Sequence, residues 1–369
     1  MTDSAPVRAV RRVLCDWRYF PYLATAILVC DAIANIILIR VAPSLPSSHI
    51  PSTHNNTHSQ LTTPRMPPHP LVQPDTEWET YMAHGAAFLR GERDYAVLRG
   101  DSARAVGPAG YVYLCAALHR LTAGGAHLVR AQALWAVLYS ATQALAFALL
   151  ARTRIAPPWA ALVLAASRQL HRLYVLRLGD DCWATLLALG AAVLLAHDRW
   201  AAGTALYCAA AGVSLAVLHY LPGLVCLLVQ RRGLARAAAC LAAACAAQLV
   251  AAAPFLAAQP AHYLGAVFDV ARRLPHVLSV NWRFVPPSLV LSRGFAAALN
   301  ACHAFLLAYL AVRRWWPRVR PTSFFADYGR PIPPQGLLSL SLSPLCSLLS
   351  ALCSPPFFGA HTHTHTQTW

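Results

Sequence analysis

The chain has 369 residues, of which 57% are hydrophobic and only 12% are charged. Soluble globular proteins carry roughly 25% charged residues, so this composition excludes a water-facing surface over most of the chain and predicts lipid surroundings. The net charge of +16 comes almost entirely from arginines, which lie in short clusters between apolar runs. That pattern is typical of the cytosolic loops of membrane proteins and argues against a nucleic-acid partner.

Apolar runs that could span or enter the bilayer number about eight, give or take about two. The first, at 20–42, has the length of a full span and no small-residue cleavage site follows it. It therefore predicts a retained helix with a cytosolic N-terminus rather than a signal peptide. The other runs lie near 108–122, 129–151, 155–169, 182–197, 203–229, 234–257 and 289–312.

An eight-span topology places the arginine clusters at 230–236 and 313–320 in the cytosol, as the positive-inside rule requires. Residues 43–107 and 258–288 then lie on the opposite, lumenal side. The same topology leaves Arg152 and Arg154 on the lumenal side, against the rule.

The first of these loops changes character along its length. Residues 44–74 are rich in Ser, Thr, His and Pro without periodicity, which predicts a disordered insertion. This stretch contains one glycosylation sequon, Asn55 with Thr57. From residue 75 to 104 the composition becomes charged and aromatic, so a structured loop suited to chemistry is expected there.

The cysteines and the C-terminal histidines give no metal site. No Cys or His spacing suits zinc, and most cysteines lie inside apolar runs as small hydrophobic side chains. Residues 321–369 read as a low-complexity tail; the alternating His361, His363 and His365 suit loose metal binding or low complexity, and the second reading is favoured.

A series of segments resembles one family, the dolichyl-phosphate-mannose-dependent alpha-1,3-mannosyltransferases that add the sixth mannose to the lipid-linked oligosaccharide. Their order and spacing fit that family from about residue 10 to 320. The segments are DTEWETYM (75–82), FLRGERDYAVLRGD (88–101), GPAGYVYLCAALHRLT (107–122), VRAQ (129–132), LYVLRLGDD (173–181), FDVARR (268–273) and SVNWRFVPPSLVLSR (279–293).

The resemblance implies an all-α, polytopic membrane protein of the endoplasmic reticulum, with a C-type glycosyltransferase-like helical bundle and a structured lumenal loop after the first span. It implies inverting transfer of mannose from dolichyl-phosphate-mannose to the dolichyl-pyrophosphate-linked five-mannose glycan, in N-glycan precursor assembly. The family is not known to need a metal, and no cofactor is expected. The expected domains are a cytosolic N-terminus at 1–19, a membrane domain at 20–320 with the insertion at 44–74, and the tail at 321–369.

The chain also departs from the family pattern. A lysine and an asparagine of the family are Ser214 and Ala216 here, and Gly107 replaces the tyrosine of a Tyr-Pro-Ala-Gly motif. Further spans and an aromatic segment that follow residue 320 in the family are absent, so a truncated, catalytically impaired homologue is the alternative expectation. A lipid or solute transporter is less favoured, because the chain has no internal repeat and its spans consist mainly of Ala and Leu.

Inverting sugar transfer needs a base that takes the proton of the acceptor hydroxyl, and a carboxylate held in a partly dehydrated loop suits that role. The acidic pair of the family's loop corresponds to Asp75 and Glu77, which are the predicted catalytic residues. The alternative is a solvated loop, or a cap for a helix that begins near Trp78.

Further charged and aromatic residues in the matching segments are candidates for substrate binding: Arg99, Asp101, Arg177, Asp181, Asn281, Trp282 and Arg283. Arginines there suit the donor phosphate. The alternatives are a loop salt bridge for Arg99, a membrane-interface aromatic for Trp282, and a structural pair for Asp180 and Asp181, which the eight-span topology places near the cytosol. His171 and His219 lie within or beside spans and are predicted to be packed side chains.

Overall fold

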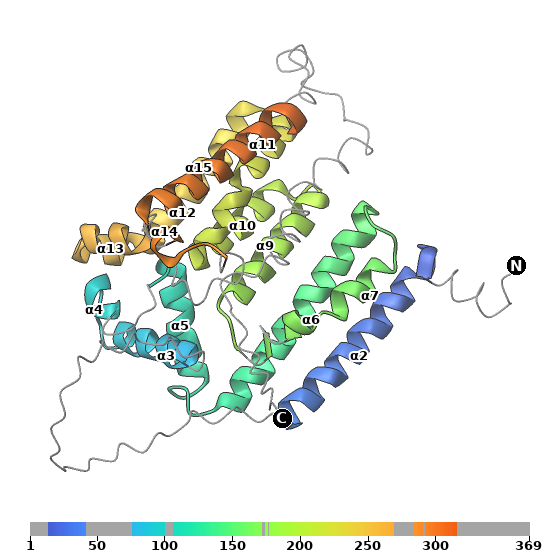
Figure 1. Ribbon diagram of the computed structural model, residues 1–369, viewed down its shortest axis with the longest axis horizontal. Helices are drawn as coiled ribbons and strands as arrows, with labels where there is room; N and C mark the ends of the chain where they lie inside the picture. The colour runs from blue at the N-terminus through green and yellow to red at the C-terminus, as the bar shows by residue number, and fades with distance from the viewer. Residues whose placement is uncertain are drawn as a thin grey trace, which may run out of the picture. The chain divides into compact units, whose positions relative to one another are not determined.

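A computed structural model describes residues 14–41, 76–99, 106–171, 174–175, 177–268, 284–290 and 292–315 of the chain (Figure 1). Within these ranges the regular structure is helical and contains no strand, which confirms the predicted all-α class. The chain divides into two compact units. One is formed by residues 1–217 and 243–267, and the other by residues 218–242 and 268–369.

The described helices of the first unit are α2 (Phe20–Val41), α3 (Thr76–Leu89), α4 (Tyr95–Arg99), α5 (Ala109–Leu121), α6 (Leu128–Thr153), α7 (Ala160–Ala165), α8 (Arg168–His171), α9 (Asp181–Ala196), α10 (Trp200–Val213), the C-terminal part of α12 (Leu234–Ala258) and α13 (Pro260–Val267). Those of the second unit are α11 (Leu221–Arg232), the N-terminal part of α12, α14 (Pro287–Val290), α15 (Arg293–Leu310) and the π-helical turn η4 (Ala311–Trp315). The 3₁₀ helix η2 (Leu215–Tyr220) contains the boundary between the two units.

Among the described residues, four helices are long and apolar enough to cross a bilayer, which confirms a polytopic membrane protein. They are α2, α6, α12, and α15 together with the start of η4. Helices α9 and α10 are also apolar but have only 16 and 14 residues, fewer than the roughly 20 that a perpendicular span needs.

Helix α2 runs antiparallel to α6. The Phe20 ring meets the Phe147 ring edge to face with centroids 6.4 Å apart, and the guanidinium of Arg154 lies 5.9 Å from the centroid of the Trp17 ring. The start of α2 therefore lies beside the end of α6.

Helix α9 runs parallel to α6. At their starts, the indole N–H of Trp135 donates to the Gly179 carbonyl at 3.0 Å. At their ends, Nε of Arg152 donates to the Ala196 carbonyl at 3.3 Å. Two tertiary hydrogen bonds at opposite ends thus fix the relative direction of these helices.

Helices α9 and α10 form an antiparallel hairpin. Asp198 adopts a left-handed φ of 58° in the short connection between them. At the open end of the hairpin, the Ser214 hydroxyl donates to Oδ1 of Asp181 at 3.0 Å. Figure 1 shows α2, α6, α9 and α10 side by side with similar axis directions.

The apolar run at 203–229, counted as one span in the expected topology, does not form one continuous helix. Helix α10 ends at Val213, and Ser214 is extended with φ −138° and ψ 127° before η2 and α11 follow. Pro222 lies in the first turn of α11, where a missing backbone N–H costs nothing. Proline inside a continuous helix would instead break it, so the sequence favours a new start at this position.

The run at 108–122, expected to span or enter the bilayer, forms a helix that is too short to cross it perpendicularly. Helix α5 has 13 residues, or about 20 Å, against a core of about 30 Å. A Cβ on Gly110, near its start, would lie 2.6 Å from the Gly212 carbonyl, close to the Ser214–Asp181 contact. At its other end, the Thr122 hydroxyl lies 3.6 Å from Sδ of Met82 in α3. Both ends of α5 therefore lie on the α3 side.

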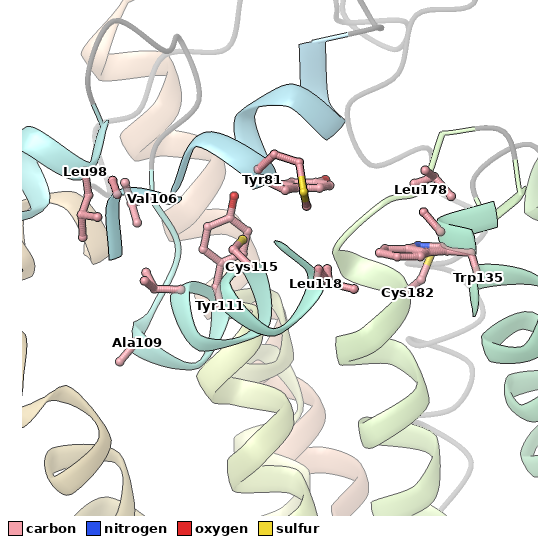
Figure 2. Close-up of a cluster of buried hydrophobic side chains, with 14 of the residues drawn as sticks. Tyr81, Leu98, Val106, Ala109, Tyr111, Cys115, Leu118, Trp135, Leu178 and Cys182 are labelled. Carbon is pink, nitrogen blue, oxygen red and sulfur yellow. The ribbon is translucent and has the colours of Figure 1, made fainter. Parts of the chain in front are cut away.

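A cluster of buried aromatic side chains lies between α3, α5, α6 and the start of α9. Figure 2 shows Tyr81 and Tyr111 from α3 and α5, and Trp135 beside Leu178 and Cys182. The α3–α5 crossing is close because Gly85 faces Cys115. A Cβ on Gly85 would lie 2.5 Å from the Cys115 carbonyl oxygen, so only glycine fits without moving a helix.

In the second unit, α15 has no buried residue, as suits a helix that faces lipid. His219 of η2 lies against His303 of α15, with the two rings perpendicular and their centroids 4.8 Å apart. His219 is exposed although its ring makes this contact, so the prediction that it is a packed side chain is wrong.

Candidate functional site

The charged and aromatic segment that begins at residue 75 forms helix α3. Trp78, Tyr81, Met82 and Gly85 follow one another at helical spacing, and this face of α3 turns toward the protein. The Trp78 ring meets Trp135 edge to face with centroids 6.0 Å apart. Helix α3 is therefore a fixed element of the first unit rather than a solvated loop.

Tyr81 connects α3 to the start of α9. Its hydroxyl lies 3.2 Å from Oδ1 of Asp180 and 3.2 Å from the backbone nitrogen of the same residue. The hydroxyl can donate to the carboxylate while it accepts from the N–H, so one side chain makes two complementary hydrogen bonds. Tyr81 is only 1% exposed, which makes both bonds costly to lose.

This contact corrects the expected topology. The eight-span arrangement places Asp180 and Asp181 near the cytosol, on the side opposite residues 43–107. The Tyr81–Asp180 hydrogen bonds instead place the start of α9 on the same side as α3. Since α6 runs parallel to α9, Arg152 lies at the end of α6 remote from α3.

Asp181 is the first residue of α9 and its side chain is exposed. The Ser214 hydroxyl donates to its Oδ1 at 3.0 Å. Ser214 is the position at which the family pattern has a lysine. A side chain at this position thus reaches the Asp181 carboxylate.

The turn that carries Arg177 and Asp180 is held tightly. Leu178 is buried although its φ of +53° lies in the left-handed region that few leucines adopt. Gly179 accepts the indole N–H of Trp135. Arg177 is half-buried in the same turn. Predicted binding residues Arg177 and Asp181 are thus brought together on one anchored segment.

Contacts of Asp94 and Tyr95 hold the start of helix α4, which ends at Arg99. Oδ1 of Asp94 accepts the Ala96 N–H at 2.9 Å and lies 2.8 Å from Nδ1 of His262 in α13. The Ala96 N–H and then the His262 contact lower the pKa of Asp94 below its ordinary value. The Tyr95 hydroxyl, whose pKa burial raises, donates to the Gly107 carbonyl at 3.1 Å.

The remaining predicted site residues are not tested by this structure. Glu77 and Arg99 lie in α3 and α4, but their side chains are outside the described part of the chain. Asp75, Asp101, Asn281, Trp282 and Arg283 lie outside the described residues altogether. Their catalytic and binding roles stay predictions. Within the described ranges no group of three or more His, Cys, Asp or Glu side chains could hold a metal ion.

Sequence reasoning missed Tyr81 and the role of Ser214. A usable signal for Tyr81 was its place on the apolar face of α3, three residues after Trp78, because a buried tyrosine hydroxyl needs a partner. No local pattern indicates that Asp180 is that partner, since 99 residues separate the two.

Residues 73–335 match the family described as "ALG3 protein". The chain belongs to this family. The match confirms the resemblance seen in the sequence segments, and it covers the whole described first unit from α3 onward.

Curated relatives in the ALG3 family include proteins of a plant, an animal and a fungus that are each named Dol-P-Man:Man(5)GlcNAc(2)-PP-Dol alpha-1,3-mannosyltransferase. The chain is 35% identical to the protein of Arabidopsis thaliana over 239 residues, 65% of this chain and 54% of the relative. It is 36% identical to that of Homo sapiens over 248 residues, 67% and 57% of the two chains. It is 34% identical to that of Neurospora crassa over 242 residues, 65% and 54%.

The chain spans about half the length of the curated relatives it matches. No solved structure matches the chain.

Proposed function

We propose that the chain transfers mannose, with inversion and in alpha-1,3 linkage, from dolichyl-phosphate-mannose to the dolichyl-pyrophosphate-linked five-mannose oligosaccharide. Membership of the ALG3 family supports this proposal, and the names of the relatives supply the donor and the acceptor. The structural observation that supports it most is the Tyr81–Asp180 contact, which joins the helix of Glu77 to the segment of Arg177 and Asp181.

The proposed site faces the lumen of the endoplasmic reticulum. Arg152 and Arg154 lie at the end of α6, which is remote from α3. With these arginines in the cytosol, as the positive-inside rule requires, α3 and the start of α9 lie in the lumen. Arg152 and Arg154, which the eight-span topology left on the lumenal side, then obey the positive-inside rule.

In the proposed reaction, Asp75 or Glu77 takes the proton from the attacking acceptor hydroxyl. Proton transfer to a positioned base typically contributes about 10²–10⁴ in rate. The leaving phosphate needs positive charge where its own charge develops. Arg177, Arg99 and Arg283 are the proposed sources of that charge, while Asp101, Asp181, Asn281 and Trp282 contact the sugars.

The test is transfer in cells that lack this mannosyltransferase, followed by analysis of their lipid-linked glycans. The chain is expressed as it stands and also as a chimera with the C-terminal half of the human relative. We expect the chimera to extend the five-mannose glycan by one mannose. A properly inserted chimera that leaves the glycan unextended refutes the proposed function.

Two variants of the chimera, Asp75→Asn and Glu77→Gln, test the base. The matched control is Glu79→Gln, because Glu79 is an exposed residue of the same helix. We expect one of the first two variants to lower transfer roughly 10²-fold or more and the control to leave it within about twofold. Wild-type rates in both test variants would show that the base lies elsewhere.

A further inference from the structure

An acidic side chain lies inside the first span. Asp31 is near the middle of α2 and only 8% exposed. Ionisable residues within spans are costly, and they are usually paired and functional. None of the site residues discussed above lies on α2, so Asp31 has no role in the proposed reaction as described so far.

The partner of Asp31 is His171, the last residue of α8. Its Nε2 lies 3.5 Å from Oδ1 of Asp31, and its Nδ1 lies 3.1 Å from the Ser167 carbonyl oxygen. A carbonyl only accepts hydrogen bonds, so Nδ1 must carry a hydrogen. Nε2 then faces the Asp31 carboxylate.

The surroundings of the pair are polar and incompletely satisfied. The Tyr139 ring lies against His171 with centroids 4.7 Å apart, and Gln143 donates to the Tyr139 hydroxyl at 2.8 Å. Asn35 follows Asp31 by one helical turn and is 1% exposed. Among the described residues, both amide atoms of Asn35, Oε1 of Gln143 and Oδ2 of Asp31 have no hydrogen-bond partner.

Such a cluster is a poor way to stabilise a helix bundle. An unpaired buried polar atom loses its hydrogen bonds to water and gains none in return, which lowers the stability of the fold. Replacing a buried ion pair by apolar residues of similar size is often neutral or stabilising. Stability alone is therefore a poor explanation of the Asp31–His171 pair, whose contact fixes the end of α8.

The chain that follows His171 leads to the candidate site. The Tyr174 hydroxyl donates to the Thr142 hydroxyl at 3.3 Å, and the Tyr174 ring lies 5.3 Å from Tyr139. Further on, Gly179 is bound by Trp135, and Asp180 by Tyr81. Helices α6 and α3 thus hold the middle and the far end of the segment, and Asp31 of α2 holds its beginning.

We propose that Asp31 and His171 are positioning residues: their pair within the membrane anchors the segment from His171 to Asp181 and so sets the position of Arg177 and Asp181 toward the substrates. The inference rests on the proposed function for the roles of Arg177 and Asp181. The anchoring itself does not depend on that function.

The test compares Asp31→Leu, His171→Leu and the double variant Asp31→Leu/His171→Leu in the full chain. The matched control is Thr25→Val, because the exposed Thr25 hydroxyl on the same helix bonds only the Pro21 carbonyl among the described groups. Hydrogen–deuterium exchange of the peptide covering residues 174–180 is measured in nanodiscs. The thermal midpoint of unfolding is measured on the same samples.

We expect exchange of this peptide to be roughly tenfold faster in all three leucine variants and unchanged in the control. The double variant should recover the thermal midpoint that the single variants lose, because it leaves no unpaired buried charge. If the double variant recovers both the wild-type exchange rate and the wild-type thermal midpoint, the pair has only a packing role and the proposal is overturned. Unchanged exchange in every variant also overturns it.

Transfer kinetics in the chimera provide the functional arm. A positioning role raises the KM of the donor or the acceptor by about fivefold in the double variant, although its midpoint is restored. A purely structural role lowers only the amount of active enzyme and leaves both KM values unchanged. Unchanged KM values would therefore refute the proposal that the pair sets the position of Arg177 and Asp181. If wild-type chimera shows no transfer, the proposed function fails, whereas the exchange experiment still decides the anchoring.

Discussion

The Tyr81 hydroxyl of α3 lies 3.2 Å from both Oδ1 and the backbone nitrogen of Asp180 at the start of α9. One phenol thus binds two groups of a residue that is 99 positions away in the chain. The contact assigns α3 and the start of α9 to one side of the membrane.

Tyr81→Phe removes both hydrogen bonds and keeps the ring. We expect the free energy of unfolding to fall by about 1–3 kcal/mol, because the Asp180 carboxylate and N–H are left without this partner. We also expect the KM of one substrate to rise in the chimera. Thermal unfolding in nanodiscs and transfer kinetics check the two effects. Tyr22→Phe is the control, since Tyr22 is 76% exposed on α2; equal effects of the two variants would contradict the assigned contact.

Ser214→Lys tests the environment of Asp181. The serine hydroxyl already reaches Oδ1 of Asp181 at 3.0 Å, so an ammonium group at this position should form an ion pair with the exposed carboxylate. Because the pair is exposed, we expect it to add no more than about 1 kcal/mol to the stability. Donor KM in the chimera is the more sensitive measurement.

The family pattern has lysine at this position, so Ser214→Lys is expected to lower the donor KM or leave it unchanged. Ser214→Met has a similar length without the charge and serves as the control. A fall in thermal stability that both variants share would show that the side chain does not fit beside Asp181.

Gly85→Ala tests the close crossing of α3 and α5. The added Cβ would lie 2.5 Å from the Cys115 carbonyl oxygen, so one helix must move. We expect a loss of about 1–3 kcal/mol in the free energy of unfolding. Gly265→Ala in α13 is the matched control, since its Cβ meets no atom within 4 Å. That variant should be neutral or stabilising by up to about 1 kcal/mol through helix propensity.

Acid should release α4 from α13. The pKa of Asp94 is lowered in the folded protein, first by the Ala96 N–H and then by His262. Its contribution to stability is therefore fully present above the ordinary value of 3.8 and is lost as the pH falls through the lower folded pKa. Asp94→Asn should be less stable than wild type at pH 6 and approach it below pH 3.8. Thermal midpoints across this range check the sign; a difference that grows on acidification would contradict it.

The long helices were predictable because an apolar run of span length has few alternatives in a bilayer. The predicted runs at 20–42, 129–151 and 234–257 differ from α2, α6 and α12 by at most two residues at either end. Composition also separated the segment at 75–104 from the stretch before it, and α3 and α4 form within that segment.

Two other apolar runs were each counted as one membrane span and do not form one. Apolar character alone does not show whether a helix crosses the membrane. The 203–229 run divides at Ser214, and the 108–122 run forms α5, which begins and ends on one side. Both outcomes depend on tertiary contacts, such as the approach of Gly110 to Gly212. For the candidate site, the sequence indicated Asp181 and Arg177, but the eight-span topology placed Asp181 on the side opposite residues 43–107. The contact with Tyr81, which no local pattern indicates, puts the start of α9 on the same side as α3.

Leu178 keeps a backbone conformation that costs a non-glycine residue about 1–3 kcal/mol, and its side chain is buried beside Trp135. Relaxing the backbone at this residue would pull the side chain out of the core. Under the proposed function, the groups that follow Leu178 need no ordering when a lipid substrate binds, so that cost does not weaken substrate affinity. Capture of a substrate that diffuses in the plane of the membrane then depends on encounter rather than on the closing of a loop.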